Sequence, residues 1–354
     1  MKSSRVTLQD VADLAKVSRP SASLVLNGRG TIQPSTRQRV LEAAKQLGYR
    51  PNPIASGLRL SRTNMIGVLW VFAGPHASTQ LVRHFNESAL AQGYSALIHD
   101  TIGDAAVIVS QLEEMTRLRV DGLILQITAG QERNLPGFER LLKLVPQVVI
   151  VSDEPLEIDH PQIILSRHRA MADATRHLVA CGRTSFGFLE REKTTGFSNQ
   201  LKLNAVRSTL KELGVKDDVA TFQADMTHAW KVDLEEIDRI FMRSPRTAGL
   251  DVLLATTDEL AAAAITSLRR MGKRIPEEIA VVGFNDTPIA SFFDPPIATV
   301  QRNEEAVAIR AIQRLIANIK NPEQATPERE EVEMNFVWRA SAGGPPWKPD
   351  SLVP

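Results

Sequence analysis

The pattern of apolar residues changes character near residue 64. Before it, apolar side chains recur at the three- and four-residue spacing of short helices, on Val11 and Leu14, on Ala22, Val25 and Leu26, and on Val40, Ala44 and Leu47. After it, short apolar runs alternate with longer helical segments. The pattern therefore predicts a small helical head, whose three apolar stripes form a mini-core, followed by a larger body.

Each short helix of the head has a recognisable start or end. Thr7 can cap the first helix in a capping-box arrangement with the residue three positions on. Ser18 can cap the second helix, with Pro20 in the first turn, where a missing N–H costs nothing. The third helix starts near Pro34 and ends at Gly48 in a left-handed cap. Three short helices with a tight turn between the first two predict a helix-turn-helix unit.

The charge is distributed unevenly between the head and the body. Residues 1–64 contain eleven Lys and Arg against three Asp and Glu, whereas the whole chain has a net charge of +1. The outer face of the second helix carries Arg19, Ser21 and Ser23, whose short hydroxyls can reach phosphates and base edges. We interpret the head as a DNA-binding unit; the alternative is an ordinary solvated basic face.

The residues from Val6 to Leu69 resemble the N-terminus of the lactose-repressor (LacI/GalR) family of transcription factors. They contain TLQDVA, TRQRV and LGYRPN in the family's order and without gaps. The resemblance implies a dimeric, ligand-controlled DNA-binding protein. By position it implies phosphate contacts from Thr7, Ser18, Ser23 and Asn27, and it places Arg19, Pro20 and Ser21 at the start of the recognition helix. Because Pro20 and Leu24 cannot hydrogen-bond to a base through their side chains, we expect Arg19 and Ser21 to read the sequence.

The segment 50–63 resembles the family's hinge, which forms a helix only when two subunits meet on DNA. Leu58 matches the leucine that enters the minor groove at the centre of the operator, a known way to kink a duplex. Arg59 would then lie against phosphate or the groove floor. The alternative is a plain flexible linker.

The body alternates strands and helices, which predicts parallel sheets covered by helices on both faces. About 275 residues suit two doubly wound lobes, with ligands at the carboxyl ends of the strands. The expected strands are Met65–Phe72, Ser95–His99, Gly122–Gln126, Val148–Val151, Ile163–Leu165, Ser185–Leu189, Thr221–Gln223, Val252–Ala255 and Ile279–Val282. The expected helices include Gln80–Ala91, Ala170–Ala180, Lys202–Leu213 and Glu259–Arg270.

The family resemblance continues through the body, in TRHLVACGRTSFGFL and in the stretch from Thr257 to Val300. It implies two lobes like those of periplasmic sugar-binding proteins, with three chain crossings and a ligand in the cleft between them. We expect a helix-turn-helix domain at 1–49, a hinge at 50–63, an effector-binding and dimerisation domain at 64–340 and a tail at 341–354. Within the body, lobe 1 is expected at about 64–161 plus 291–325, and lobe 2 at about 162–290 plus 326–340.

The resemblance also implies effector-binding positions, and two of them depart from the family pattern. Lys202 stands where many members have an Arg that forks onto sugar hydroxyls, and Asn285 stands where they have Asp. A sugar or polyol would suit the site, but Lys202 could also meet the anion of a phosphorylated or acidic sugar. His76 can equally be a surface histidine. The remaining expected effector residues are Phe72, Ser78, Asp153, Thr257, Asp258 and Phe293, with Phe72 and Phe293 packing on the sugar ring.

Other signals narrow the function further. The sequence contains no P-loop, G-x-S-x-G, H-E-x-x-H or paired C-x-x-C motif, so we expect no enzyme, metal or cofactor. With one cysteine, no apolar leader and no apolar run long enough for a bilayer, we expect a cytoplasmic protein that does not enter membranes. The tail lacks leucine heptads, so we expect a homodimer on a pseudo-palindromic operator.

The favoured hypothesis is a transcriptional regulator, a repressor, whose DNA binding a small molecule weakens or strengthens. The alternative is a small-molecule receptor or carbohydrate enzyme whose basic head is not regulatory.

Overall fold

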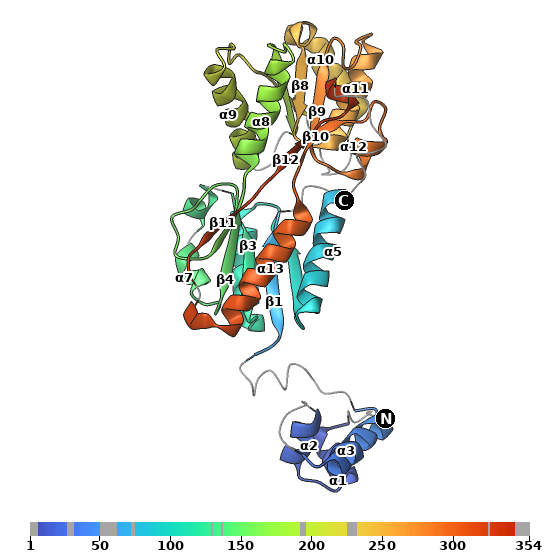
Figure 1. Cartoon of the computed structure of the whole chain (residues 1–354), viewed down its shortest axis with the longest axis vertical. Helices are drawn as coiled ribbons and strands as arrows, with labels where there is room; N and C mark the ends of the chain where they lie inside the picture. The colour runs from blue at the N-terminus through green and yellow to red at the C-terminus, as the bar shows by residue number, and fades with distance from the viewer. Residues whose placement is uncertain are drawn as a thin grey trace. The chain divides into compact units, whose positions relative to one another are not determined.

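The computed structural model describes residues 6–26, 32–49, 62–71, 75–128, 130–135, 137–191, 196–224, 232–324 and 326–343, with backbone only at 75–78, 134 and 196–198. The chain divides into two compact units, Met1–Asn64 and Met65–Pro354, which are described separately (Figure 1).

The head contains three short helices around a small apolar core. They are α1 (Leu8–Leu14), α2 (Arg19–Leu26) and α3 (Pro34–Leu47). The core consists of Val11, Ala12, Ala15, Ala22, Val25, Val40, Ala43 and Ala44. Alanines make up five of these eight positions, so the helices can approach closely even though each is short.

The helix ends predicted from the sequence are confirmed. Thr7 and Asp10 form the capping box of α1. The Ser21 backbone N–H donates to Ser18 Oγ at 3.3 Å, which satisfies one of the free donors at the start of α2. Gly48 follows α3 with φ +64°, a conformation that glycine adopts without strain.

The prediction that Leu14 belongs to the core stripe of the first helix is wrong. Its side chain is 44% exposed, whereas Ala12 and Ala15 are buried. The face of α1 that packs on α2 and α3 therefore runs through Val11, Ala12 and Ala15 and leaves Leu14 at its edge, because Ala15 lies four positions after Val11 and three after Ala12, the spacings that share a helix face.

The body begins with a six-stranded sheet in which every strand pair is parallel. The strand order is β11-β5-β4-β3-β1-β2. The strands are β1 (Met65–Trp70), β2 (Ser95–Asp100), β3 (Gly122–Gln126), β4 (Val148–Ser152), β5 (Gln162–Leu165) and β11 (Arg329–Val332). The helices of this lobe are α5 (Pro75–Ala91), α6 (Ala105–Leu118), α7 (Phe138–Leu142) and α13 (Glu304–Lys320), with short 3₁₀ turns at Gln131–Asn134 and Pro322–Gln324. We call this sheet and its helices lobe 1.

A second six-stranded sheet forms lobe 2, with the order β12-β10-β9-β8-β6-β7 and only β12 antiparallel. Its strands are β6 (Phe186–Arg191), β7 (Ala220–Ala224), β8 (Val252–Ala255), β9 (Ala280–Asn285), β10 (Ala298–Gln301) and β12 (Asn335–Val337). Its helices are α8 (Arg167–Ala180), α9 (Gly196–Glu212), α10 (Leu234–Arg243), α11 (Asp258–Arg270) and α12 (Pro288–Phe292), with 3₁₀ turns at Pro245–Gly249 and Ala340–Ala342. The predicted fold class, a helical head and two parallel-sheet lobes, is confirmed.

The apolar core of the body is divided into clusters that lie on different faces of the two sheets. One cluster packs α5 and α13 on lobe 1 and α8 and α9 on lobe 2. A second cluster lies under α10 and α11, and a third under α6 and α7. Strands β3 and β4 are buried along their whole length, as expected when helices cover both faces of a parallel sheet.

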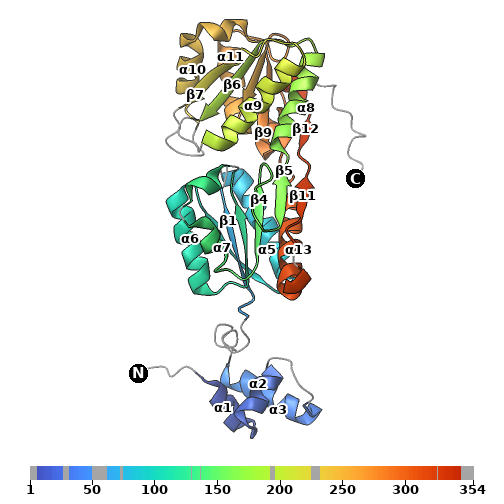
Figure 2. The ribbon, with the colours of Figure 1, turned by 90° about the vertical axis from the view of Figure 1, so that its left-hand side faces the viewer.

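The chain crosses between the lobes three times, and the crossings lie later than the sequence analysis expected. Strand β5 pairs with β4, so lobe 1 extends to Leu165 rather than 161. Strand β10 still pairs with β9 in lobe 2, and the return to lobe 1 comes at residues 302–303 rather than 291. Strand β11 pairs with β5 at one edge of lobe 1 (Figure 2), so the last crossing follows Val332. Of these strands, β10 and β11 were not predicted from the sequence; β11 is an edge strand of four residues and is largely polar.

In the part of the chain that the structure describes, no helix combines the length and apolarity needed to span a membrane.

Candidate functional site

The first turn of α2 presents the predicted base-reading residues on the surface of the head. Ser18, Arg19 and Pro20 are exposed, and Ser21 is half-buried. The Ser18 and Ser21 hydroxyls lie 2.8 Å apart, so one hydroxyl restrains the other and fixes its direction. Leu24 is 40% exposed on the same helix. An exposed Arg and an exposed Leu on this helix suit contact with a guanine edge and a thymine methyl, respectively.

Thr7 is exposed and takes part in the capping box of α1. Its backbone N–H and its hydroxyl donate to Asp10 Oδ2 at 2.7 and 2.8 Å. These hydrogen bonds lower the pKa of the Asp10 carboxyl, first through the backbone and then through the side chain of Thr7. A phosphate contact at Thr7 therefore uses a group that the capping box has already oriented.

Several predicted residues fall outside the described part of the structure. Asn27, Leu58, Arg59 and Phe72 lie in undescribed segments, and His76 and Ser78 have described backbone only, in the first turn of α5. Their proposed roles stay predictions.

In lobe 2, Lys202 reaches the carboxyl edge of the sheet where the strand order reverses. Strand β6 has β7 on one side and β8 on the other, and such switch points are where open α/β sheets bind ligands. Lys202 extends from α9 so that Nζ lies 3.7 Å from the centre of the Phe284 ring. The same Nζ donates to the Thr256 carbonyl, directly after β8, at 3.5 Å. Lys202 is 6% exposed, so its charge is nearly removed from water.

The predicted Asp153 lies at the matching edge of lobe 1, immediately after β4. Its carboxylate pairs with Arg167, the first residue of α8, with Nε 2.9 Å from Oδ1 and Nη1 3.2 Å from Oδ2. Both side chains are buried. The pair joins the carboxyl edge of the lobe 1 sheet to the first residue of α8 in lobe 2.

A third cation, Arg302, directly follows β10 at the next crossing. Its Nη1 lies 3.4 Å from Glu304 Oε1, and both residues are largely buried. Burial lowers the pKa of Lys202 well below its usual value, and Arg167 and Arg302 lower it further against the opposing effects of Asp153 and Glu190. The polar cluster therefore combines Lys202, Arg167 and Arg302 with two ion-paired carboxylates.

Asn285, at the end of β9, lines a cavity of about 210 Å³ beside this cluster. Asn285 is 9% exposed. Its φ of +104° lies outside the range of a regular strand, and β9 ends at this residue. The cavity also takes residues from α5 of lobe 1, Gln80 and His84, so both lobes contribute to it. An amide at this position can donate to and accept from a hydroxyl.

Thr257 and Asp258 make hydrogen bonds within lobe 2 that hold its helices and strands together. The Thr257 hydroxyl caps α11 by accepting from the Leu260 N–H at 3.2 Å. Asp258 is fully buried and accepts from the Thr287 N–H at 2.7 Å, from the Thr287 hydroxyl at 3.0 Å and from Thr299 at 2.6 Å. These bonds use both carboxylate oxygens, so the structure gives Asp258 a positioning role behind Asn285 rather than an open ligand-facing one. Burial raises the pKa of Asp258 to about 7, although the hydrogen bonds oppose that rise.

The structure does not place Phe293 in the cleft. Its ring is partly buried against the apolar cluster under α10 and α11, with Ala290 and Ile297. The family-based expectation that it packs on a sugar ring is therefore replaced by a packing role in lobe 2.

Sequence analysis missed Arg167, Arg302 and His84. Arg167 and Arg302 each come one or two residues after a short strand, which is where a parallel sheet presents side chains to a ligand. The strand before Arg302 was not predicted, so this signal was not used. No group of residues suited to hold a metal ion is present among the described ones.

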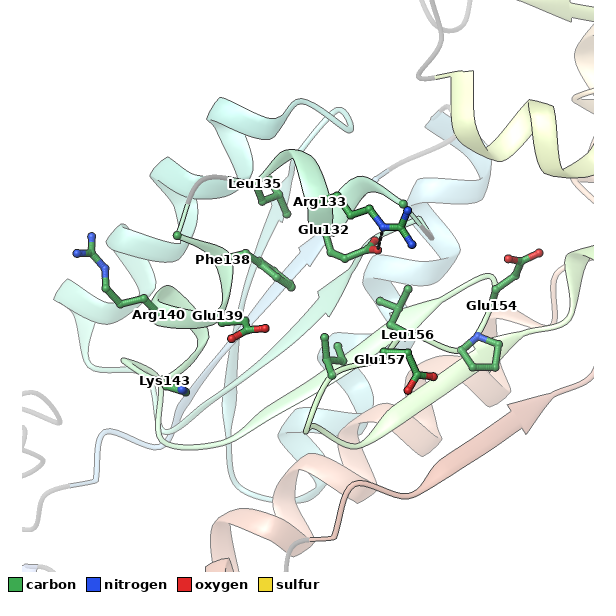
Figure 3. Close-up of a pocket in the computed structure, with 14 residues that line it drawn as sticks. Glu132, Arg133, Leu135, Phe138, Glu139, Arg140, Lys143, Glu154, Leu156 and Glu157 are labelled. Carbon is green, nitrogen blue, oxygen red and sulfur yellow. Dashed lines mark ion pairs between the residues drawn. The ribbon is translucent and has the colours of Figure 1, made fainter.

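A larger groove, of about 930 Å³, lies away from this cluster on lobe 1 (Figure 3). It runs between α7 and the loop after β4, and its charges are mixed, with Glu132, Glu139 and Glu157 facing Arg133 and Lys143. It contains none of the predicted effector residues.

The comparisons with known proteins agree with this architecture. Residues 7–52 match the family model described as bacterial regulatory proteins, lacI family, and residues 175–342 match a periplasmic binding protein-like domain. The chain thus joins a head that matches the LacI family to a body that matches a periplasmic binding protein-like domain. This confirms the family resemblance of the head and of the body.

Relatives and solved structures extend this LacI-family match over nearly the whole chain. The HTH-type transcriptional regulator DegA of Bacillus subtilis (strain 168) is 28% identical over 298 residues, which cover 84% of this chain and 86% of DegA. A lac repressor dimer bound to operator and the anti-inducer ONPF superposes with a TM-score of 0.81 at 22% identity, covering 95% of this chain and 99% of that one. The transcriptional regulator CelR in complex with cellobiose has a TM-score of 0.64 at 23% identity and covers 95% and 100%. The relatives are regulators, not enzymes, as expected for this chain.

Proposed function

We propose that this chain is a repressor that binds a pseudo-palindromic operator as a homodimer and responds to a small-molecule effector. The observation that carries the proposal is the pairing of two modules in one chain. The head exposes Arg19 on the first turn of α2, and the body gathers Lys202, Asp153 and Asn285 at facing strand ends. A lac repressor dimer bound to operator has the same fold, which supports the DNA and dimer parts of the proposal. Such a protein acts in the cytoplasm, where its DNA is.

On the DNA side, Arg19 and Ser21 read base edges in the major groove. Arg19 can donate two hydrogen bonds to one guanine, and Ser21 can donate or accept once. The phosphate contacts come from Thr7, Ser18, Ser23 and Asn27, which fix the register of α2 on the duplex. Leu58 and Arg59 act at the centre of the operator, through a hinge helix too short to be stable alone.

On the effector side, the ligand is a sugar or sugar derivative held between the lobes. Asp153, Lys202 and Asn285 supply charge and hydrogen bonds, and Phe72, His76 and Ser78 are the further contacts that the family positions predict. The fold of a regulator in complex with cellobiose supports a sugar-like ligand. Because the lobes are joined by three crossings, a ligand that prefers one lobe arrangement changes the spacing of the two hinge segments in the dimer.

The DNA part of the proposal is tested by selecting binding sites from random duplexes and measuring specific and non-specific affinity. We expect a selected site with two inverted half-sites about one helical turn apart. Arg19→Ala should lose specific affinity by about tenfold or more, since a bidentate Arg–guanine contact is worth about 1–3 kcal/mol. Arg39→Ala, an equal charge loss on the exposed face of α3, should lower both affinities together. Equal losses of specific affinity in the two variants would contradict the role of Arg19.

A further inference from the structure

We propose that the effector of this protein is an anion, a carboxylate- or phosphate-bearing sugar derivative, and that its anionic group lies against Lys202. The inference rests on the proposed function, because it names the ligand class of the same cleft.

The first argument is the balance of buried charges at the cleft. Arg167, Arg302 and Lys202 are 6%, 4% and 6% exposed. Arg167 has Asp153 as its counter-ion, and Arg302 has Glu304. Among the described residues, no carboxylate lies within ion-pair distance of Lys202. Of the three cations, Lys202 is therefore the one without an ion-paired carboxylate; Asp153 and Glu190 act on it only from beyond ion-pair distance.

The protein offers the Lys202 ammonium only weak contacts in place of a counter-ion. Its ammonium has a carbonyl at 3.5 Å, at the outer limit of a hydrogen bond, and an aromatic face at 3.7 Å. A buried charge that lacks a paired, hydrogen-bonded partner is costly. Burial and the two neighbouring arginines accordingly lower the pKa of Lys202, and a ligand anion beside it would raise that pKa again.

The third argument is that a further donor in the cluster is also unused. Arg302 Nε is fully buried and has no hydrogen-bond partner in the described structure. An arginine with a free N–H, next to a lysine with no counter-ion, offers convergent donors for oxygen atoms of one anionic group. A neutral sugar could accept hydrogen bonds from these two side chains, but it would leave the Lys202 ammonium without a counter-ion.

The neighbouring cavity indicates how such a ligand is oriented. Its lining includes three carboxylates, Asp286, Glu304 and Glu305, together with Asn285. Asp286 is held by Arg339 at 2.7 Å and by Gln301 at 3.1 Å. Because that side is acidic, the hydroxyl-bearing part of the ligand faces Asn285 and the anionic group faces Lys202.

The experiment compares matched neutral and anionic ligands by isothermal titration calorimetry on the full-length protein. The probes are aldoses and disaccharides, the corresponding uronates and aldonates, and the corresponding sugar phosphates; the last two sets distinguish a carboxylate from a phosphate. We expect the tightest ligand to be anionic and to bind at least about 100-fold more tightly than its uncharged counterpart. Uncharged sugars that bind as tightly as their anionic counterparts would overturn the proposal.

Two variants separate charge recognition from folding. Lys202→Gln and Lys202→Met should each lose at least about tenfold in affinity for the anion and little for the neutral counterpart, whereas Lys211→Gln, at an exposed position of the same helix, should lose neither. Unchanged anion affinity in Lys202→Gln overturns the proposal. If no sugar in the set binds, the melting temperature in phosphate and acetate at constant ionic strength decides: stabilisation of the wild type but not of Lys202→Met supports the proposal, and equal responses overturn it.

This design keeps the two proposals distinguishable. If the anion binds through Lys202 but changes no DNA affinity, the proposed control of DNA binding fails and the ligand class stands. If a neutral sugar binds and changes DNA affinity, the regulatory function stands and the ligand class fails.

Discussion

Asp153 and Arg167 form a buried ion pair, with Arg167 Nε 2.9 Å from Asp153 Oδ1, between the end of β4 and the first residue of α8. The pair spans the first chain crossing, so it holds the carboxyl edge of the lobe 1 sheet to the first helix of lobe 2. Burial lowers the pKa of Arg167, and Asp153 opposes that shift. An account of ligand control therefore has to include the stability of this contact.

Asp153→Asn should destabilise the body. It leaves the Arg167 guanidinium buried without a counter-ion, and breaking a buried pair typically costs about 3–5 kcal/mol. Urea unfolding measures the change. The matched control is Asp173→Asn, because Asp173 pairs with Arg176 on the same helix but is half-exposed, where a pair is worth about 0–1 kcal/mol. Equal, small losses in the two variants would mean that the Asp153–Arg167 pair does not stabilise the fold.

Asp258 should make the stability of the body depend on pH. Its folded pKa of about 7 lies above the ordinary aspartate value, so the folded state holds a proton that the unfolded state has already released. The stabilisation from this group is present below about pH 4 and is lost as the pH rises towards 7. The free energy of unfolding of the wild type should therefore fall relative to that of Asp258→Asn over this window.

The linkage sets an upper limit of about 4 kcal/mol on the change at Asp258, since each pKa unit corresponds to about 1.4 kcal/mol. Denaturant titrations of both proteins at pH 4, 5.5 and 7 give the difference directly. A wild-type-minus-variant difference that does not move with pH would show that Asp258 is ionised throughout.

Gly283 should be intolerant of a side chain. A Cβ at this position would overlap with Asp258 Oδ1 and lie 3.0 Å from the Asp258 Cα, so backbone would have to shift. Gly283→Ala should cost at least about 2 kcal/mol, in the range seen for overpacking. Gly249→Ala is the control, because nothing lies within 4 Å of its Cβ. If the two variants unfold at the same denaturant concentration, the close approach of α11 to β9 is not a structural requirement.

Leu58→Ala should weaken specific operator binding far more than non-specific binding. A leucine inserted between base pairs at the operator centre contributes only where the duplex is kinked, whereas phosphate contacts act on any sequence. Gel-shift titrations on a selected operator and on a scrambled duplex give the two affinities. A uniform loss on both duplexes would argue against insertion.

Much of the fold could be predicted from the sequence, because the local signals for helix ends and buried strands are strong. The capping residues Thr7 and Ser18 and the glycine at 48 marked the ends of the head helices, and the apolar runs of β3 and β8 were predicted to the residue. The edge strands β11 and β12 were not predicted, because β11 is largely polar and β12 has only three residues.

The site was harder to predict than the fold, because its contacts join distant parts of the chain. Lys202 and Asp153 could be named from family positions, but only the fold brings Arg302 near Lys202. Phe293 was assigned to the ligand because aromatic rings suit sugars, and the structure packs it, partly buried, against the apolar cluster of lobe 2. Asp258 was assigned to the ligand from its family position, yet its partners Thr287 and Thr299 come from later segments of the chain.

The most direct test of the central claim is the operator affinity of the full-length protein with and without the ligand that binds the cleft. Fluorescence anisotropy on the selected duplex, at fixed salt, gives both dissociation constants. We predict a change of about 5- to 150-fold, the usual range of coupling between two sites, and its loss in Lys202→Met. An operator affinity that stays the same while the ligand saturates the wild-type cleft would contradict it.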